Sequence, residues 1–255
     1  MKVTADSDDV NGEGCALATI EVSAAGTHVR QLENAMVTLP RIKICCILSI
    51  EEAGLAVRYG ASAVGLVSQM PSGPGVISDD LIAEIAATVP LPVDTFLLTS
   101  LSDADAIAHQ HSVCRTSTLQ LVDSVAPAEL VRLRRQLPHV KLVQVIHVRG
   151  EHSIDEARSV AEYVDALLLD SGDPTLPVKE LGGTGRVHDW QLSRRIRETV
   201  GRPVFLAGGL RASNIQAAIR AVDPFGLDLC SGVRHEGKLS AEKLGEFMQA
   251  VRSAA

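Results

Sequence analysis

The sequence predicts an α/β protein whose parallel strands close into a single (β/α)8 TIM barrel. The chain has 255 residues, and closed α/β barrels commonly run to about 250 residues as one domain. Short apolar runs alternate with segments that carry one apolar stripe, which is typical of βα units on a parallel sheet. Eight such units follow one another, whereas a doubly wound open sheet, the main alternative, more often has about five to seven strands.

The predicted strands are short aliphatic runs of the kind that parallel sheets bury on both faces. They cover residues 41–47, 62–67, 92–98, 117–122, 140–148, 165–170, 203–208 and 225–230. Each is followed by a predicted helix, and several of these helices open with Ser or Asp, which cap the first turn. The helices cover residues 49–60, 78–89, 102–111, 126–137, 153–164, 188–200, 211–222 and 240–251.

The first part of the chain differs in composition from the rest. Residues 1–38 are rich in Gly, Ser, Thr and Ala, and their apolar residues do not recur at a regular spacing. This predicts an irregular or disordered extension. Residues 39–255 are predicted to form the barrel domain. Met36 lies just before the regular pattern, so we treat it as a candidate start of the native chain. An acidic stretch at residues 6–9, in place of a basic segment before an apolar one, argues against a secretory signal.

Composition limits the partners that the sequence predicts. Apolar residues make up 46% and the net charge is −7, which argues against a nucleic-acid partner because such a surface needs a basic face. The sequence contains no run of about 18 apolar residues, so it predicts no membrane span. The five cysteines are odd in number and lack zinc spacing, so we expect a reducing compartment, the cytoplasm, and no metal. A monomer and a homodimer both remain open.

The first predicted strand carries two chemically useful side chains. Lys43 and Cys45 are two residues apart and therefore share one face, while the isoleucines and Cys46 of that run point to the other. If the isoleucines meet the helices, Lys43 and Cys45 face the barrel lumen. A buried ammonium needs a partner, and Asp228 on the neighbouring last strand is the candidate. A nearby lysine favours the reactive thiolate; alternatively, Cys45 is a small buried hydrophobe.

The sixth predicted strand ends in a carboxylate. Asp170 follows three leucines, and a carboxylate there is costly unless it is paired or lies at the barrel mouth. Active sites of this fold lie at the carboxyl ends of the strands, so we interpret Asp170 as an acid or base. The alternative is a loop anchor, since turn-forming residues follow at once.

Glycines follow the last two strands. Gly208 and Gly209 end the seventh strand, and Ser231 and Gly232 follow the eighth. Barrels commonly hold a phosphate in these two loops, where glycine lets backbone N–H groups approach the oxygens. The alternative is a pair of tight turns. Gly183 lies in a third glycine-rich segment, 182–185, within a long loop that can supply further donors or act as a lid.

Six motifs occur in an order that resembles phosphoribosylanthranilate isomerase, over residues 41–252. They are Lys-Ile-Cys at 43–45, Gln120-Leu121, Leu-Leu-Leu-Asp at 167–170, the 182–190 loop, Leu-Ala-Gly-Gly-Leu at 206–210 and Asp228 with 231–233. The resemblance implies an Amadori isomerisation of a phosphosugar in tryptophan biosynthesis, without metal or organic cofactor. It assigns Cys45 as general base and Asp170 as general acid. The other matching positions, implied to bind substrate or phosphate, are Lys43, Gln120, Gly183, Gly208, Gly209, Asp228, Ser231 and Gly232.

The sequence also departs from the family at the anthranilate end of the substrate. The usual glycine after the cysteine is Cys46, the usual arginine in the loop after the second strand is Gly75, and Val122 replaces a histidine. Arg186 and Arg234 are candidates to supply the missing charge. Two alternatives therefore stand beside the family activity: an isomerase of another N-glycosyl phosphosugar, and a non-catalytic phosphosugar-binding barrel.

Overall fold

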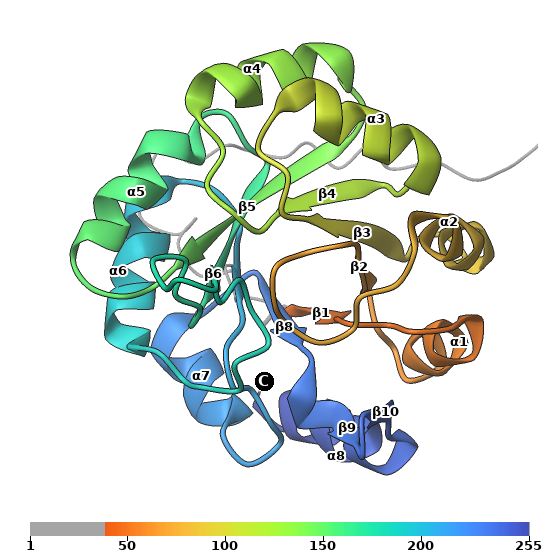
Figure 1. The fold of residues 1–255 in the computed structure, drawn as a ribbon. Helices are drawn as coiled ribbons and strands as arrows, with labels where there is room; N and C mark the ends of the chain where they lie inside the picture. The colour runs from red at the N-terminus through yellow and green to blue at the C-terminus, as the bar shows by residue number, and fades with distance from the viewer. Residues whose placement is uncertain (1–38, 255) are drawn as a thin grey trace, which may run out of the picture. The chain divides into compact units, whose positions relative to one another are not determined.

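Eight parallel strands form a closed barrel in the computed structural model, which describes residues 39–254. Each strand pairs with its sequence neighbours, and β8 pairs with β1 to close the ring (Figure 1). The strands are β1 (Arg41–Ile44), β2 (Ala63–Val67), β3 (Asp94–Thr99), β4 (Thr118–Leu121), β5 (Lys141–His147), β6 (Ala166–Asp170), β7 (Val204–Leu206) and β8 (Gly226–Leu229). The predicted barrel is confirmed.

The helices surround the strands (Figure 1). Ser49, Ser78, Asp103, Asp189 and Ser240 each cap a helix by accepting a backbone N–H of its first turn, as their positions in the sequence predict. The helices are α1 (Ile50–Arg58), α2 (Asp79–Thr88), α3 (Ala104–Cys114), α4 (Pro127–Gln136), α5 (His152–Ala161), α6 (Trp190–Val200), α7 (Ile215–Val222) and α8 (Ala241–Arg252).

The loop after β8 contains structure that the sequence pattern does not predict. A 3-10 turn, η1 (Ser231–Val233), leads into a short antiparallel hairpin, β9 (Arg234–His235) and β10 (Lys238–Leu239). The predicted extension, residues 1–38, and the candidate start Met36 lie outside the described residues.

Alternation along the strands separates two cores. Ile42 and Ile44 belong to the aliphatic layer between strands and helices, whereas Cys45 belongs to the smaller lumen cluster. The predicted lumen position of Cys45 is therefore confirmed. The prediction that Cys46 points to the helix side is wrong: β1 ends at Ile44, and Cys46 has φ +60°. Alternation applies only to extended chain, and this left-handed residue joins the lumen cluster instead.

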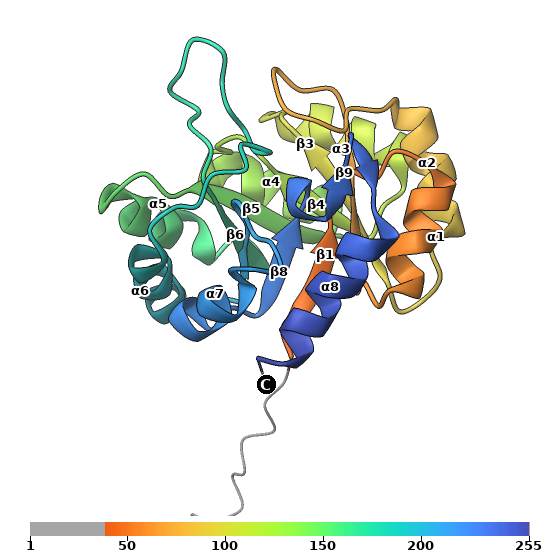
Figure 2. The same ribbon diagram turned by 90° about the horizontal axis from the view of Figure 1, so that it is seen from below.

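The two ends of the barrel differ in their loops. Figure 2 shows the loops after β2 and β6 rising from the same end, which is the end where the strands finish. These loops also contact each other, because the Ser72 hydroxyl donates to the carbonyl of Lys179. These two loops therefore partly cover the carboxyl end of the barrel.

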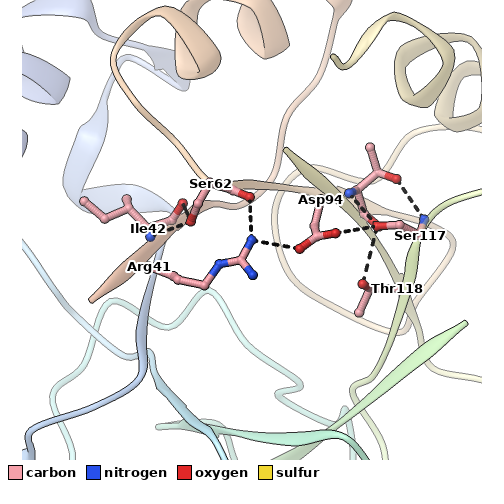
Figure 3. A network of polar contacts seen from close by, with 7 residues as sticks. Arg41, Ile42, Ser62, Asp94, Ser117 and Thr118 are labelled. Atoms are coloured by element: carbon pink, nitrogen blue, oxygen red, sulfur yellow. Dashed lines mark hydrogen bonds and ion pairs between the residues drawn. The ribbon is translucent and has the colours of Figure 1, made fainter. Parts of the chain in front are cut away.

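A polar network ties the strands together at the opposite end (Figure 3). Arg41 at the start of β1 contacts Asp94 at the start of β3 at 2.8 Å, and also donates to the carbonyl of Ser62 at 3.1 Å. The Ser117 hydroxyl donates to the other Asp94 oxygen at 3.2 Å. The network holds the starts of these strands together. Its role is structural, because it lies at the end of the barrel opposite to the loops after β2 and β6.

We expect Asp94→Ala to lower the free energy of unfolding by about 1 kcal/mol, because it removes a half-exposed ion pair and one hydrogen bond. Urea unfolding measures this cost. Glu84→Ala, an exposed change on α2, is the control and should cost less. An equal loss in both variants, or a large fall in kcat for Asp94→Ala, would contradict a purely structural role.

Candidate active site

A pocket opens at the carboxyl end of the barrel, between the loops after β1, β2, β6, β7 and β8. Nine of the ten residues predicted for the site line it, and the tenth, Lys43, lies fully buried beneath. The nine are Cys45, Gln120, Asp170, Gly183, Gly208, Gly209, Asp228, Ser231 and Gly232. The structure thus brings the predicted site together.

Lys43 and Asp228 form the predicted ion pair. The Lys43 Nζ lies 2.8 Å from Asp228 Oδ1, and the two side chains are 0% and 8% exposed. Burial lowers the pKa of the Lys43 ammonium, but the charge and hydrogen bond of Asp228, together with the nearby Cys45 and Cys46, raise this pKa overall. The ammonium also lies 5.3 Å from the centre of the Phe96 ring. Lys43 therefore remains a fixed positive charge below the pocket.

Gly65 on β2 makes room for Cys45 beside this charge. A Cβ at position 65 would lie 2.9 Å from both Cys45 Sγ and Lys43 Nζ, closer than real side chains approach. The thiol and the ammonium therefore share one space in the lumen that only glycine leaves free. Sequence reasoning missed Gly65, whose sole signal is a glycine inside a strand.

Asp170 is buried at the end of β6. Its Oδ1 accepts the Ser171 backbone N–H at 2.7 Å, and its Oδ2 lies 3.0 Å from the point where a Cβ of Gly182 would sit. Burial raises the pKa of the Asp170 carboxyl, while the Ser171 N–H and the neighbouring His147 moderate this effect. The carboxyl can therefore hold a proton above the pH at which an exposed aspartic acid loses it.

His147 was not predicted as part of the site. It ends β5, opposite Asp170 in the β5–β6 register, and its Nε2 contacts the Val122 carbonyl at 3.0 Å. Its Nδ1 has no partner among the described residues, and it lies against Gly172. The rule that singled out Asp170, a polar residue closing an apolar strand, would have found His147 too.

Gln120 is a buried polar side chain with unused capacity. It is 3% exposed, lines the pocket, and its Oε1 has no partner among the described residues. A buried amide oxygen without a partner is costly. It is therefore available to accept a hydrogen bond from a ligand hydroxyl.

Glycines let three loops meet backbone to backbone. A Cβ on Gly209 would lie 2.7 Å from the Gly185 carbonyl oxygen, and one on Gly232 would collide with the carbonyl oxygen of Leu210. Gly208 and Gly209 also have φ of +84° and +61°, which L side chains rarely adopt. The loops after β6, β7 and β8 therefore form a cradle that exposes main chain, as phosphate sites of this fold do.

We expect Gly232→Ala to raise KM and the inhibition constant of inorganic phosphate roughly tenfold, about 1.4 kcal/mol. The added methyl must push the Leu210 carbonyl away and so open the cradle. Gly150→Ala, in the loop after β5, is the control because its Cβ would find only ordinary contacts of 3.5 Å or more. Unchanged phosphate inhibition in Gly232→Ala would remove these loops from phosphate binding.

Cys46 and Gly75, two of the residues that differ from the family pattern, contact each other. A Cβ on Gly75 would lie 2.5 Å from Cys46 Cβ and 2.9 Å from Cys46 Cα. Cys46 therefore fills the space next to residue 75, and the cysteine and the glycine form one steric unit.

Arg234 and Arg186, the two candidates to replace the missing arginine, are both already paired with carboxylates. Arg234 donates to both carboxylate oxygens of Glu52, at 3.0 and 2.9 Å, and to the Cys46 carbonyl. Arg186 is paired with Glu180 in the loop after β6. Neither side chain lines the pocket.

None of the helices in the described part of the chain combines the length and the hydropathy of a membrane-spanning segment. Within residues 39–254, His, Cys, Asp and Glu form no group of three that could hold a metal ion.

A buried acid, a thiol beside a fixed ammonium and a glycine cradle at the last two strands define a barrel enzyme that acts on a phosphorylated small molecule. The profile of N-(5'-phosphoribosyl)anthranilate (PRA) isomerase matches residues 42–250. The chain belongs to this family, and it is an isomerase of tryptophan biosynthesis.

Individual relatives agree with the family. An N-(5'-phosphoribosyl)anthranilate isomerase of Methanosarcina mazei is 36% identical over 195 residues, 76% of this chain and 85% of that protein. The phosphoribosyl anthranilate isomerase structure from Thermus thermophilus has a TM-score of 0.71 and 27% identity, covering 84% of this chain and all of that one. A structure of a phosphoribosyl anthranilate isomerase in complex with reduced 1-(o-carboxyphenylamino)-1-deoxyribulose 5-phosphate has a TM-score of 0.70 and 25% identity. It covers 84% of this chain and 99% of its own.

Proposed function

We propose that this pocket isomerises N-(5'-phosphoribosyl)anthranilate with Asp170 as general acid and Cys45 as general base. The observation that carries the assignment is the environment of Asp170, a carboxyl that lines the pocket and whose burial raises its pKa, which favours the protonated form. An acid and a base acting on one sugar must lie on different sides of it. Cys45 follows β1 and Asp170 ends β6, and β7 and β8 separate these strands on the shorter path around the barrel.

The proposed reaction transfers one proton at each residue. Asp170 gives its proton to the furanose ring oxygen as the ring C–O bond breaks, which leaves a protonated Schiff base at C1. The Cys45 thiolate then takes the proton from C2, and that C–H electron pair forms the C1–C2 double bond. The resulting enol-amine tautomerises to the ketose. Lys43, held by Asp228, keeps a positive charge beside Cys45 in the lumen.

The remaining predicted residues hold the substrate in this proposal. Gly208, Gly209, Ser231 and Gly232 surround the phosphate with main chain and one hydroxyl. Gln120 accepts a hydrogen bond from a ribose hydroxyl through its unused oxygen. Gly183, which packs on Pro74, allows the long loop after β6 to reach across the mouth and limit the access of water.

Complementation of a tryptophan auxotroph that lacks this isomerase tests the proposal. Rescue by the wild-type chain, lost in Cys45→Ala and in Asp170→Ala, is the expected result. Rescue that persists in Asp170→Ala would remove the acid from the mechanism.

A second substrate is favoured by one observation, the exchange at Cys46 and Gly75. An isomerase of another N-glycosyl phosphosugar would not need an arginine there. Calorimetric titration with the reduced carboxyphenylamino analogue separates the two substrates. Failure of the wild-type chain to bind the analogue would leave the second one.

We also propose that residues 39–255 carry the activity, in the cytoplasm, as a monomer or homodimer. The family match at 42–250 falls entirely within this part. A chain that starts at Met36 should therefore rescue the auxotroph as well as the full chain does, and sedimentation distinguishes the two oligomeric states.

A further inference from the structure

Two thiols at the pocket wall have no role in the reaction. Cys46 follows β1 and Cys230 follows β8, and the two sulfur atoms lie 2.8 Å apart and share a hydrogen bond. A disulfide bond is about 2.05 Å long, so the sulfurs need to approach by less than about an ångström to bond.

The backbone allows this approach. β1 and β8 are neighbouring parallel strands, with Ile44 opposite Leu229. Cys230 follows Leu229 directly, whereas Cys46 lies two residues past Ile44, where its φ of +60° turns the chain toward the lumen. The two sulfurs therefore meet from neighbouring strand ends, and only a small shift is needed for them to bond.

The position of Cys46 is restrained from two sides. Gly75 lies against its Cβ, where any side chain would collide. Arg234, itself held by Glu52, donates to the Cys46 carbonyl. These contacts hold Cys46 in the place from which its sulfur reaches Cys230.

The two thiols differ in reactivity. The hydrogen bond with Cys46 lowers the pKa of Cys230, and the charge of Arg234 adds to this effect. The same hydrogen bond raises the pKa of Cys46, and burial raises it further. Cys230 is also the more exposed of the two, so Cys230 is the thiolate that an oxidant meets first.

We propose that Cys46 and Cys230 form a reversible disulfide that switches the isomerase off under peroxide. The Cys230 thiolate attacks hydrogen peroxide, an S–O bond forms, the O–O bond breaks and hydroxide leaves. The Cys46 sulfur then attacks Cys230, the S–S bond forms, and the sulfenic oxygen leaves as water. Two thiols lose two protons and two electrons, and one hydrogen peroxide takes up both to become two waters.

The link acts on both ends of the substrate, a consequence that rests on the proposed function. Cys46 is bonded to the proposed base Cys45, and Cys230 to Ser231 of the phosphate cradle. Closing the sulfurs pulls these neighbours together, and a misplacement of about 1 Å can cost roughly a hundredfold in rate. Oxidation therefore lowers the activity while the fold remains.

The test treats the reduced full-length protein with hydrogen peroxide, blocks free thiols with iodoacetamide and maps the digest by mass spectrometry without reductant. We expect a Cys46–Cys230 peptide about 2 Da lighter than the sum of its reduced halves. Activity should fall roughly tenfold to a hundredfold and return with dithiothreitol.

Variants separate the link from damage to Cys45. Cys230→Ser, compared with its own untreated activity, should form no link and lose less activity. Cys114→Ser is the matched control, because Cys114 lies apart at the end of α3, and it should respond as wild type does. Activity loss without the linked peptide, or the linked peptide without activity loss, would overturn the switch. The mass readout stands even if the proposed isomerisation fails, so the two failures are distinguishable.

Discussion

Cys45→Ala and Asp170→Asn should each lower kcat by roughly 10²- to 10⁴-fold, the usual contribution of a positioned acid or base. Both side chains line the pocket and are nearly buried, and neither change introduces bulk. The loss should therefore appear in kcat, with KM changed much less. Because the two residues act on one reaction, the double variant should lose less than the product of the single losses.

The pH profile distinguishes a missing acid from a disturbed pocket. Asp170 must be protonated to act, so kcat/KM should fall as the pH rises through its pKa, which burial has raised. Asp170→Asn should lose that limb, because an amide does not titrate there. Steady-state rates from acid to mild alkali, with circular dichroism to check folding, measure it.

Two matched changes serve as controls. Cys114→Ala removes a buried thiol and Asp80→Asn an exposed carboxylate, both outside the pocket. They should keep near wild-type kcat. An Asp170→Asn variant with an unchanged profile would show that another group, with His147 the nearest candidate, supplies the proton.

The accuracy of the sequence predictions follows the regularity of the backbone. Lys43 lies in extended chain, where a period of two determines which face a side chain takes, so its lumen position was predictable. Cys46 lies one step past the strand, where φ turns positive, and the same rule gave the wrong face. Its contact with Cys230 joins positions 184 apart in sequence, which no local pattern contains.

The glycines show a second limit of prediction from the sequence. The glycines after β7 and β8 were recognisable because this fold commonly binds phosphate there. Gly65 was not, because its importance comes from Lys43 and Cys45 on the adjacent strand. A residue that matters through the space it leaves empty is visible only when its neighbours are placed.

Gly75→Arg, which installs the family's usual residue, should destabilise this chain by roughly 2–5 kcal/mol. Position 75 has φ +85°, and a left-handed conformation costs a side chain about 1–2 kcal/mol. The new Cβ also meets Cys46 Cβ at 2.5 Å, and overpacking of this kind costs about 1–3 kcal/mol. Urea unfolding monitored by circular dichroism measures the sum.

Adding Cys46→Gly should recover about 1–3 kcal/mol of that loss, the usual coupling between residues in contact. Glycine removes the Cβ and Sγ that the new side chain meets, and it accepts the φ of +60° at position 46. Gly73→Arg is the control: φ there is +110°, but the nearest atom to its Cβ is 3.7 Å away. Its cost should be independent of Cys46→Gly, and purely additive costs at 46 and 75 would contradict the steric unit.

The double variant Cys46→Gly with Gly75→Arg also tests whether the residues at positions 46 and 75 determine the substrate. If anthranilate occupies this end, a guanidinium at position 75 supplies a cation for its carboxylate, and KM should fall relative to Cys46→Gly alone. That single variant is the right reference, because Cys46→Gly also takes away the partner of Cys230 and changes the pocket wall. A KM that rises instead would mean that the aglycone end has been rebuilt around Cys46, and that the arginine no longer has a carboxylate to meet.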